Sequence, residues 1–165
     1  MNLHNECLYM KQHQYPLHIT WTGNRGTGTS AYTAYGREHR IEGPNKAPLD
    51  ASADTPFQGD ATKYNPEDML VASLSACHML WFLHLCADRG IIVTAYEDHP
   101  LGILQQESHG SGQFKEVTLN PKVRVNNSEH IALLDDLHRL AGEKCFIANS
   151  VNFPVHCFGR GEASI

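Results

Sequence analysis

Two cysteines are the residues of this chain best placed for redox chemistry. Cys77 lies in the middle of the longest apolar stretch, Met69–Ala87, which contains no Lys, Arg, Asp or Glu. Cys145 lies far downstream, in the segment Glu-Lys-Cys-Phe-Ile-Ala-Asn-Ser at the end of a second helical pattern. The thiolate form of cysteine is the nucleophile in thiol chemistry. Two thiols in such different surroundings indicate a redox pair that the fold brings together, rather than an adjacent C-x-x-C motif.

The remaining cysteines give no sign of a disulfide framework. The chain contains five cysteines, and an odd number in a chain of this length does not fit a stapled secreted domain. The first residues show no basic segment followed by an apolar one, so no signal peptide is readable. We therefore expect a cytoplasmic protein, in which Cys7, Cys86 and Cys157 are structural or incidental thiols.

Composition and charge argue against nucleic acid as a partner. The 165 residues carry a formal net charge of -5, and no basic patch is interleaved with aromatic residues. A chain of this length can bury a hydrophobic core without metal or disulfides. We expect a globular protein that binds neither nucleic acid nor a membrane.

The apolar stretch Met69–Ala87 predicts a helix in a protein core. Its length is near the lower limit for crossing a bilayer, about 17–25 residues. Acidic residues flank it, however, and the Lys/Arg bias of a membrane span is missing. Asn65 suits the N-cap, Pro66 the first helical position and Gly90 the C-terminal cap. A helix that is apolar nearly all round should be central in the fold.

The other patterns predict strands and a second helix. Alternating or β-branched residues indicate strands over 17–22, 30–35, 93–96, 102–106, 117–125 and 151–158. Ser128 is expected to cap a helix that continues through about Lys144. Residues 43–63 are rich in Pro, Gly, Ala, Ser and Asp and predict a long connecting loop. Because helices and strands do not alternate, the fold class is α+β. We expect a single domain over 1–165, with residues 1–16 as an N-terminal extension.

One short sheet and one amphipathic helix are too small to cover every side of a central helix that is apolar nearly all round. We therefore hypothesise a homodimer in which the central helices of two chains pack together and strands cross the interface.

Two motifs carry a further signal. The first is Tyr-Asn-Pro-Glu-Asp-Met-Leu-Val-Ala-Ser-Leu-Ser-Ala-Cys, which ends at Cys77, and the second surrounds Cys145. The first resembles the N-P-E-x-L…A-C signature of the OsmC/Ohr family of organic hydroperoxide reductases, and the second resembles that family's other cysteine motif. The spacing of the two motifs also suits the family. Trp21-Thr-Gly-Asn-Arg-Gly26 adds a further similarity. The resemblance implies an OsmC-like fold: an intertwined homodimer with two long central helices flanked by antiparallel sheets, and active sites at the subunit interface.

The resemblance also implies a cysteine-based peroxidase that reduces organic hydroperoxides. Burial raises the pKa of a thiol, so an active thiolate needs a cation beside it. The helix around Cys77 carries no such residue. Arg25 matches a position where Ohr-type members carry an arginine, and Arg37 or Arg40 are the alternatives. Glu67 lies too far along the helix to be the base for Cys77, and the family's matching glutamate orients that arginine.

The implied cycle begins with Cys77, which the peroxide oxidises to a sulfenic acid. Cys145 then condenses with it to a disulfide, and an external dithiol, of lipoyl type or another small dithiol, restores both thiols. Apolar side chains near the two cysteines would favour bulky organic hydroperoxides over hydrogen peroxide; they are Met79, Trp81, Phe82 and Phe146.

Two alternatives remain open at this point. Eleven histidines and five cysteines invite a metal site, for which Cys77, His84 and Cys145 are the candidate ligands. The second alternative is a redox-sensing or ligand-binding protein of the same fold without significant turnover. We expect neither a cofactor nor a metal in the peroxidase. His78 points about 100° away from Cys77 around the helix, which predicts a polar contact elsewhere.

Overall fold

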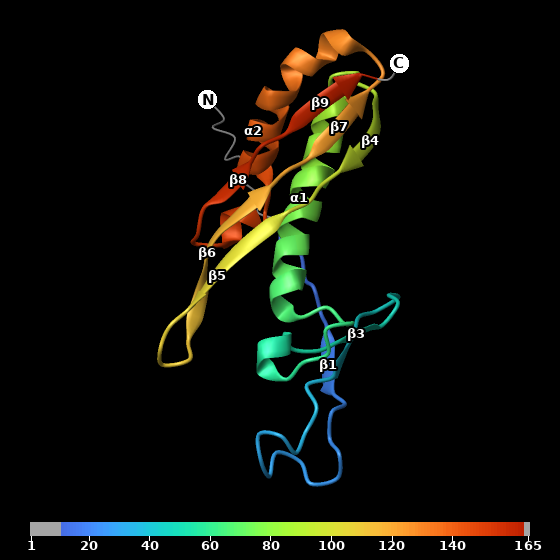
Figure 1. Ribbon diagram of the computed structural model, residues 1–165. Helices are drawn as coiled ribbons and strands as arrows, with labels where there is room; N and C mark the ends of the chain where they lie inside the picture. The colour runs from blue at the N-terminus through green and yellow to red at the C-terminus, as the bar shows by residue number, and fades with distance from the viewer. Residues whose placement is uncertain (1–10, 164–165) are drawn as a thin grey trace, which may run out of the picture. The chain divides into compact units, whose positions relative to one another are not determined.

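The computed structural model describes residues 11–163. Their contacts divide the chain into two compact units, with the boundary after Asn65 (Figure 1). Each unit is described by itself. The predicted single domain over 1–165 stays a prediction, and Cys7 lies outside the described residues.

The N-terminal unit contains a small antiparallel sheet. Its strands are β1 (His18–Trp21), β2 (His39–Glu42) and β3 (Leu49–Ala51), in the order β1-β2-β3. The first predicted strand is thus confirmed. The predicted loop over 43–63 contains β3 and a short 3-10 helix, η1 (Thr55–Phe57).

The strand predicted over 30–35 is wrong, because these residues form turns. The Arg37 guanidinium lies over the rings of Tyr32 and Tyr35, 4.4 and 4.0 Å from their centroids. It also donates hydrogen bonds to the backbone carbonyls of both tyrosines. One cation therefore gathers the two aromatic residues and folds the segment back on itself. Tyr32 and Tyr35 therefore contact Arg37 instead of lying on a strand.

The C-terminal unit is built on α1 (Pro66–Asp88), which confirms the predicted central helix. Its buried residues include Leu74, His78 and Phe82, spaced four apart and therefore on one face. Gly90 follows the helix with φ +68°, a left-handed conformation that glycine adopts without strain. By length and composition α1 is also long and apolar enough to cross a membrane, a test that core helices of soluble proteins pass as well.

The C-terminal unit also contains two three-stranded sheets that share one pattern of strand pairing. One has the order β4-β7-β9, and the other has the order β5-β6-β8. In each, the first pair is antiparallel and the second is parallel. The strands are β4 (Val93–Glu97), β5 (Leu101–Gln106), β6 (Gly112–Leu119), β7 (Lys122–Val125), β8 (Val155–Cys157) and β9 (Arg160–Ala163).

The two sheets follow one another along three continuous stretches of chain. β4 leads into β5, β6 into β7 and β8 into β9, with gaps only at 98–100, 120–121 and 158–159 (Figure 1). Hydrogen bonds connect the gaps: Phe158 N–H donates to the Leu119 carbonyl at 2.9 Å and Arg160 N–H to that of Pro121 at 2.8 Å. We call the region formed by residues 98–100, 120–121 and 158–159 the sheet break. The single strand predicted over 117–125 is therefore two strands in two sheets, because Pro121 donates no ladder hydrogen bond. The last predicted strand, 151–158, is shorter, and β9 was not predicted.

The second helix begins later than predicted. Residues Ser128–Leu133 form a 3-10 helix, η2, and α2 covers Leu134–Lys144. Asn127, not Ser128, is the cap, because its side chain accepts a hydrogen bond from Glu129 N–H. A short 3-10 turn, η3 (Ala148–Ser150), follows α2.

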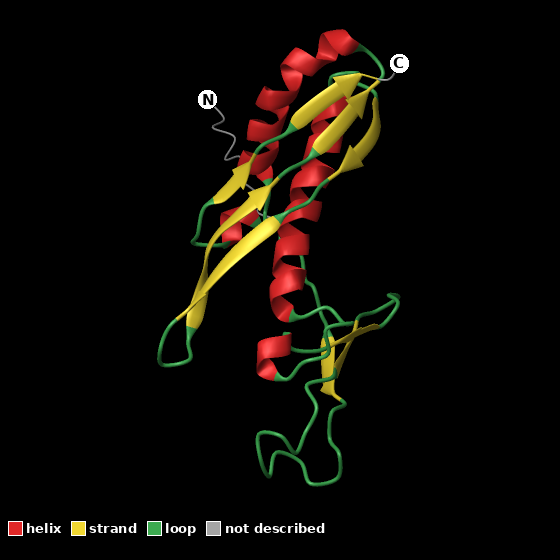
Figure 2. Cartoon of the chain, viewed as in Figure 1, coloured by secondary structure: helices red, strands yellow, loops and turns green. Residues whose placement is uncertain are grey.

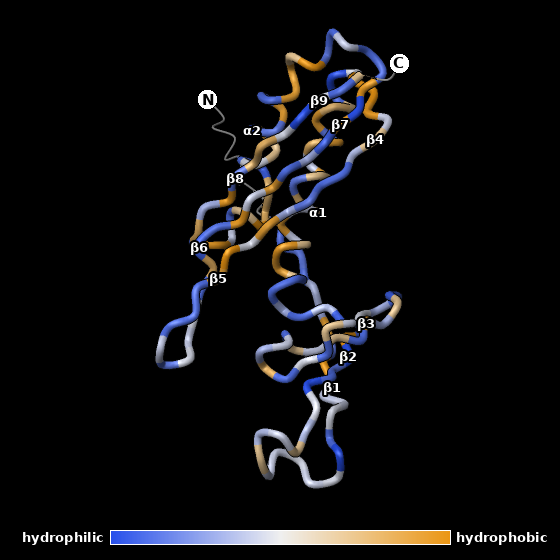
Figure 3. Tube along the Cα trace, in the orientation of Figure 1, coloured by the Kyte–Doolittle hydropathy of each residue, from blue (hydrophilic) through white to orange (hydrophobic). Residues whose placement is uncertain are grey.

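Both helices lie on the same face of the two sheets (Figure 2). Apolar residues run along α1 and through parts of α2, β5 and β6 (Figure 3). They form two clusters, one around Phe82, Val123 and Leu137, the other around Leu74, Val117 and Leu119. The fold is α+β, as predicted.

Candidate active site

The fold brings Cys77 and Cys145 together within one chain. Cys77 lies in the middle of α1, and Cys145 is the residue that ends α2. Their side chains are in hydrogen-bonding contact. Cys77 is half-buried and Cys145 is buried, and neither is in a disulfide. The pair that the sequence indicated is thus adjacent in space, in a geometry that needs no second subunit.

Cys145 is held as a neutral thiol in this pair. Burial raises its pKa to about 11, and its hydrogen bond to Cys77 acts in the same direction. The turn after α2 opposes these two effects, because Ala148 N–H donates to Cys145 Sγ at 3.4 Å. Cys145 is therefore protonated at neutral pH.

An aromatic pair accompanies the two cysteines. Trp81 is four residues after Cys77 on α1, and Phe146 directly follows Cys145. Their rings meet edge to face with centroids 5.7 Å apart, and Lys144 Nζ lies 5.5 Å from the Trp81 centroid. Phe146 remains exposed. The pair offers an apolar surface beside the cysteines.

Phe82, also expected there, belongs to the core instead. It is fully buried and stacks on His138 with ring centroids 4.1 Å apart. Phe82 directly follows Trp81 on α1, so its side chain points to a different side of the helix, the side that faces the sheets. The prediction that Phe82 lines a substrate site was therefore wrong.

The predicted charged residues occupy different places. Glu67 lies in the first turn of α1, ten residues from Cys77, which is about 15 Å along a helix. Arg25 is exposed in the loop after β1, in the N-terminal unit. Its position beside Cys77 stays a prediction. Of the alternatives, Arg37 is engaged with its two tyrosines, and Arg40 is paired with Asp50 at 3.1 Å.

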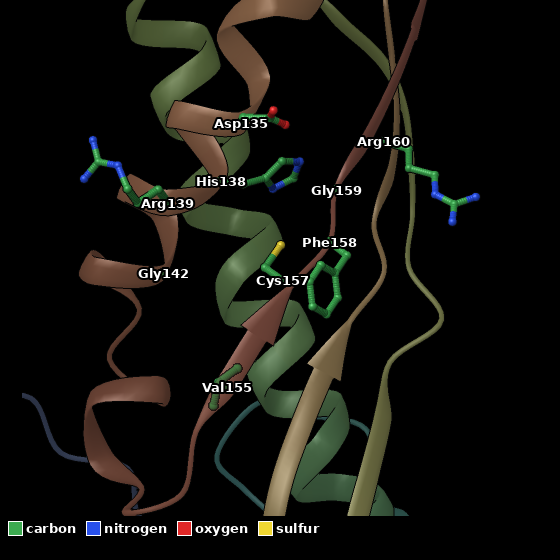
Figure 4. A pocket seen from close by; sticks show the side chains of 9 residues that line it. All are labelled: Asp135, His138, Arg139, Gly142, Val155, Cys157, Phe158, Gly159 and Arg160. Carbon is green, nitrogen blue, oxygen red and sulfur yellow. The ribbon is translucent and has the colours of Figure 1, made fainter.

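A second group of reactive side chains lies on the other side of α1. His78 Nε2 is 3.0 Å from Nδ1 of His138 on α2 and 3.5 Å from Sγ of Cys157 at the end of β8. Figure 4 shows the Cys157 sulfur directed towards the His138 imidazole. The polar contact predicted for His78 is thus present, but its partners were not predicted. The available signal was His138, a polar residue among Leu134, Leu137 and Ala141 on the apolar face of α2.

Burial keeps all three of these groups neutral. It lowers the pKa of His138 to about 4, and the neighbouring His78 adds to this effect. Burial also lowers the pKa of His78, although Asp98 opposes the shift. The pKa of Cys157 rises to about 12, chiefly through burial and next through the Asp98 carboxylate.

A cavity of about 100 Å³ links the two groups of residues. Cys145, Cys157 and His78 all line it, together with Leu74, Leu119, Gly142, Ala148 and Val155. A larger hollow of about 620 Å³ adjoins His138 and Cys157 from the side of Asp135 and Arg160. The metal site hypothesised at Cys77, His84 and Cys145 is not formed, since within residues 11–163 only His78, His138 and Cys157 bring three such ligand atoms together. His84 is exposed and 3.4 Å from Asp88.

Comparisons with known proteins identify the family and the fold of the chain. A family model described as OsmC-like protein matches residues 59–157. A search of curated proteins gave no significant match. A solved OsmC-like protein of unknown function from Vibrio cholerae O1 biovar eltor str. N16961 superposes with a TM-score of 0.77 at 32% sequence identity, over 90% of this chain and 99% of that one. The chain belongs to the OsmC-like family.

Two further structures share the fold at low identity. An organic hydroperoxide resistance protein from Elizabethkingia anophelis has a TM-score of 0.69 at 16% identity, over 93% of this chain and 99% of that one. An organic hydroperoxide resistance protein OsmC from Legionella pneumophila has a TM-score of 0.65 at 15% identity, over 94% and 99%. Some members of this structural group are thus named for hydroperoxide resistance.

Proposed function

We propose that the protein is a thiol-dependent peroxidase that reduces organic hydroperoxides to alcohols. The observation that carries this proposal is the contact between the side chain of the half-buried Cys77 and that of the buried Cys145, both free thiols. Membership of the OsmC-like family, and the names of two structural relatives, support it.

The proposed cycle uses one sulfur for each step. The Cys77 thiolate attacks the terminal oxygen of the hydroperoxide, the O–O bond breaks, and the alkoxide leaves as the alcohol after taking up a proton. Cys77 is then a sulfenic acid. The Cys145 sulfur attacks it and forms the disulfide, and water leaves with the hydroxyl group and the Cys145 proton. A small dithiol supplies two electrons and two protons by exchange, and so restores both thiols.

The surroundings support an organic substrate. The exposed Phe146 and its partner Trp81 present an aromatic surface next to the reacting sulfurs. Burying an alkyl or aryl group there is favourable by about 25 cal/mol per Å² of apolar surface, which hydrogen peroxide cannot gain. In this proposal Arg25 supplies the cation for the Cys77 thiolate and Glu67 orients it, across a homodimer.

Replacement of each cysteine in turn tests the cycle. We expect Cys77→Ser to abolish consumption of an alkyl hydroperoxide with a dithiol reductant, because the nucleophile is lost. Cys145→Ser should stop at a Cys77 sulfenic acid, which a dimedone-type reagent traps and mass spectrometry locates. The intact enzyme should consume the alkyl hydroperoxide faster than hydrogen peroxide, and a dithiol should support turnover better than a monothiol.

Cys86→Ser is the matched control, since it removes a buried thiol from the same helix and should leave turnover intact. Activity retained in Cys77→Ser would disprove the assignment. A single oxidation of Cys77 without repeated turnover, in the presence of excess dithiol, would instead indicate a redox sensor.

A further inference from the structure

We propose that His78, His138 and Cys157 form a binding site for a zinc ion, separate from the Cys77–Cys145 pair. The three residues come from α1, α2 and the end of β8 and meet beneath the sheet break. Their ligand atoms all lie within 4.8 Å of one another. The inference goes beyond the proposed peroxidase and does not depend on it.

The distances fit the coordination shell of zinc. Zinc binds imidazole nitrogen at about 2.0–2.1 Å and thiolate sulfur at about 2.3 Å, usually in a tetrahedron. Two ligand atoms are then separated by roughly 3.3 Å for N and N and roughly 3.6 Å for N and S. The observed separations are 3.0 Å between His78 Nε2 and His138 Nδ1, and 3.5 Å between His78 Nε2 and Cys157 Sγ. The third pair, His138 Nδ1 and Cys157 Sγ, lies within 4.8 Å. Zinc binding therefore requires the imidazoles to open by a few tenths of an ångström and the Cys157 sulfur to adjust towards His138.

A single hydrogen bond at His78 Nε2 cannot serve both of the atoms that it faces. This nitrogen carries either one proton or one lone pair, yet it lies close to both His138 Nδ1 and Cys157 Sγ. A cation between the three facing atoms lets each of them donate a lone pair to the same centre, which no placement of protons achieves.

The electrostatic surroundings favour a cation. The carboxylates of Asp98 and Asp135 both act on Cys157, and Asp98 also acts on His78. Asp98 is itself fixed at the sheet break, because it accepts hydrogen bonds from Asn120 N–H and from the Ser75 hydroxyl. Negative charge held near two imidazoles and a thiol stabilises a bound divalent ion.

The site leaves one coordination position for a fourth ligand. His78 and Cys157 line the cavity of about 100 Å³, which has room for water. Three protein ligands and an open position are the arrangement of zinc sites that bind an exchangeable ligand. Cys145 lines the same cavity, so the zinc position and the redox pair face a common space.

Gly159 holds the imidazole of His138 in place. A Cβ at position 159 would overlap the His138 ring. The glycine therefore lets the chain between β8 and β9 close over His138 at the sheet break. Gly159→Ala is expected to displace the ring and weaken metal binding while keeping every ligand.

The experiment uses the full-length protein and metal ions alone. Metal-free protein is titrated with zinc(II) against a chromophoric chelator, and separately with cobalt(II), whose spectrum reports thiolate coordination. We expect one zinc per chain and a thiolate-to-cobalt charge-transfer band. Zinc-edge X-ray absorption should show one sulfur and two imidazole nitrogens.

Variants identify the ligands. Cys157→Ser and His138→Gln should each weaken zinc binding by more than the roughly 10- to 100-fold that loss of an outer-shell partner costs. Cys77→Ser should leave zinc affinity unchanged. Absence of stoichiometric zinc and of the cobalt band in the unmodified protein would overturn the proposal, whatever the folding of the variants. Loss of binding in Cys77→Ser but not in Cys157→Ser would also overturn it, by moving the site to the redox pair.

Discussion

At the scale of single residues, Cys145 is held as a neutral thiol beside Cys77. Burial raises its pKa to about 11, so it is protonated at neutral pH. In the proposed cycle Cys145 therefore loses its proton as it attacks the Cys77 sulfenic acid.

Alkylation rates should show this protonation. We expect iodoacetamide to modify Cys145 slowly at neutral pH and progressively faster towards pH 11, because the thiolate is the reacting form. Peptide mapping after timed alkylation measures the rate at each cysteine. A rate at Cys145 that is the same at neutral pH and at pH 11 would show that burial does not keep this thiol protonated.

The cluster of His78, His138 and Cys157 shows what sequence reasoning misses at this scale. The three residues are far apart in the chain and match no metal-ligand spacing. Cys157 was expected to be incidental and His78 to make an unspecified polar contact. Only the packing of α2 and β8 against α1 brings them together. By contrast, Cys77 and Cys145 could be predicted because each lies in a recognisable motif.

At the scale of elements, α1 has two different faces. The face with Leu74, His78 and Phe82 is buried in the chain's own core, whereas Ala72, Ala76 and Leu80 are exposed. These exposed positions are also four apart, and they form a narrow stripe of small and apolar residues. The predicted pairing of two central helices in a homodimer would cover this stripe.

A charge in the stripe should break the dimer. We expect the unmodified protein to have a dimeric mass at low micromolar concentration, and Leu80→Glu to shift it to monomer, because burying an unpaired carboxylate is unfavourable. Sedimentation velocity or light scattering measures the mass. Leu133→Glu, which changes another exposed leucine, is the control and should remain dimeric. A monomeric mass for the unmodified protein would contradict the expected assembly.

Local pattern predicted the helices better than the strands. The caps and apolar content of α1 are local signals, and its limits were nearly right. The strand pattern over 117–125 was real, but Pro121 divides it between two sheets. Residues 30–35 were expected to form a strand, yet Arg37 binds Tyr32 and Tyr35 in a turn. A nearby arginine and a proline inside the pattern decided these two cases, and neither effect is visible in hydrophobic periodicity.

At the scale of the whole molecule, buried thiols limit stability at high pH. Burial raises the pKa of Cys86 to about 11, as it does that of Cys145. In the unfolded chain these thiols ionise near their ordinary pKa of 9.0, whereas in the folded protein they stay neutral. The stabilisation from neutral thiols is fully present below pH 9 and is lost as the pH rises towards 11.

Unfolding measurements across this range should show the loss. We expect the free energy of unfolding to fall between pH 9 and 11, by up to about 1.4 kcal/mol per pH unit for each buried thiol. Urea titrations at several pH values measure it. Cys86→Ala should remove the contribution of one thiol and so make the free energy of unfolding less dependent on pH, even if the variant is less stable overall. An unchanged slope would show that Cys86 ionises equally well in the folded state.

The tight packing of Gly159 against the imidazole at position 138 has a consequence for evolution. A relative with any larger residue at 159 lacks room for an imidazole in this orientation. The two positions should therefore vary together: glycine at 159 wherever histidine stands at 138, and freedom at one only where the other has changed.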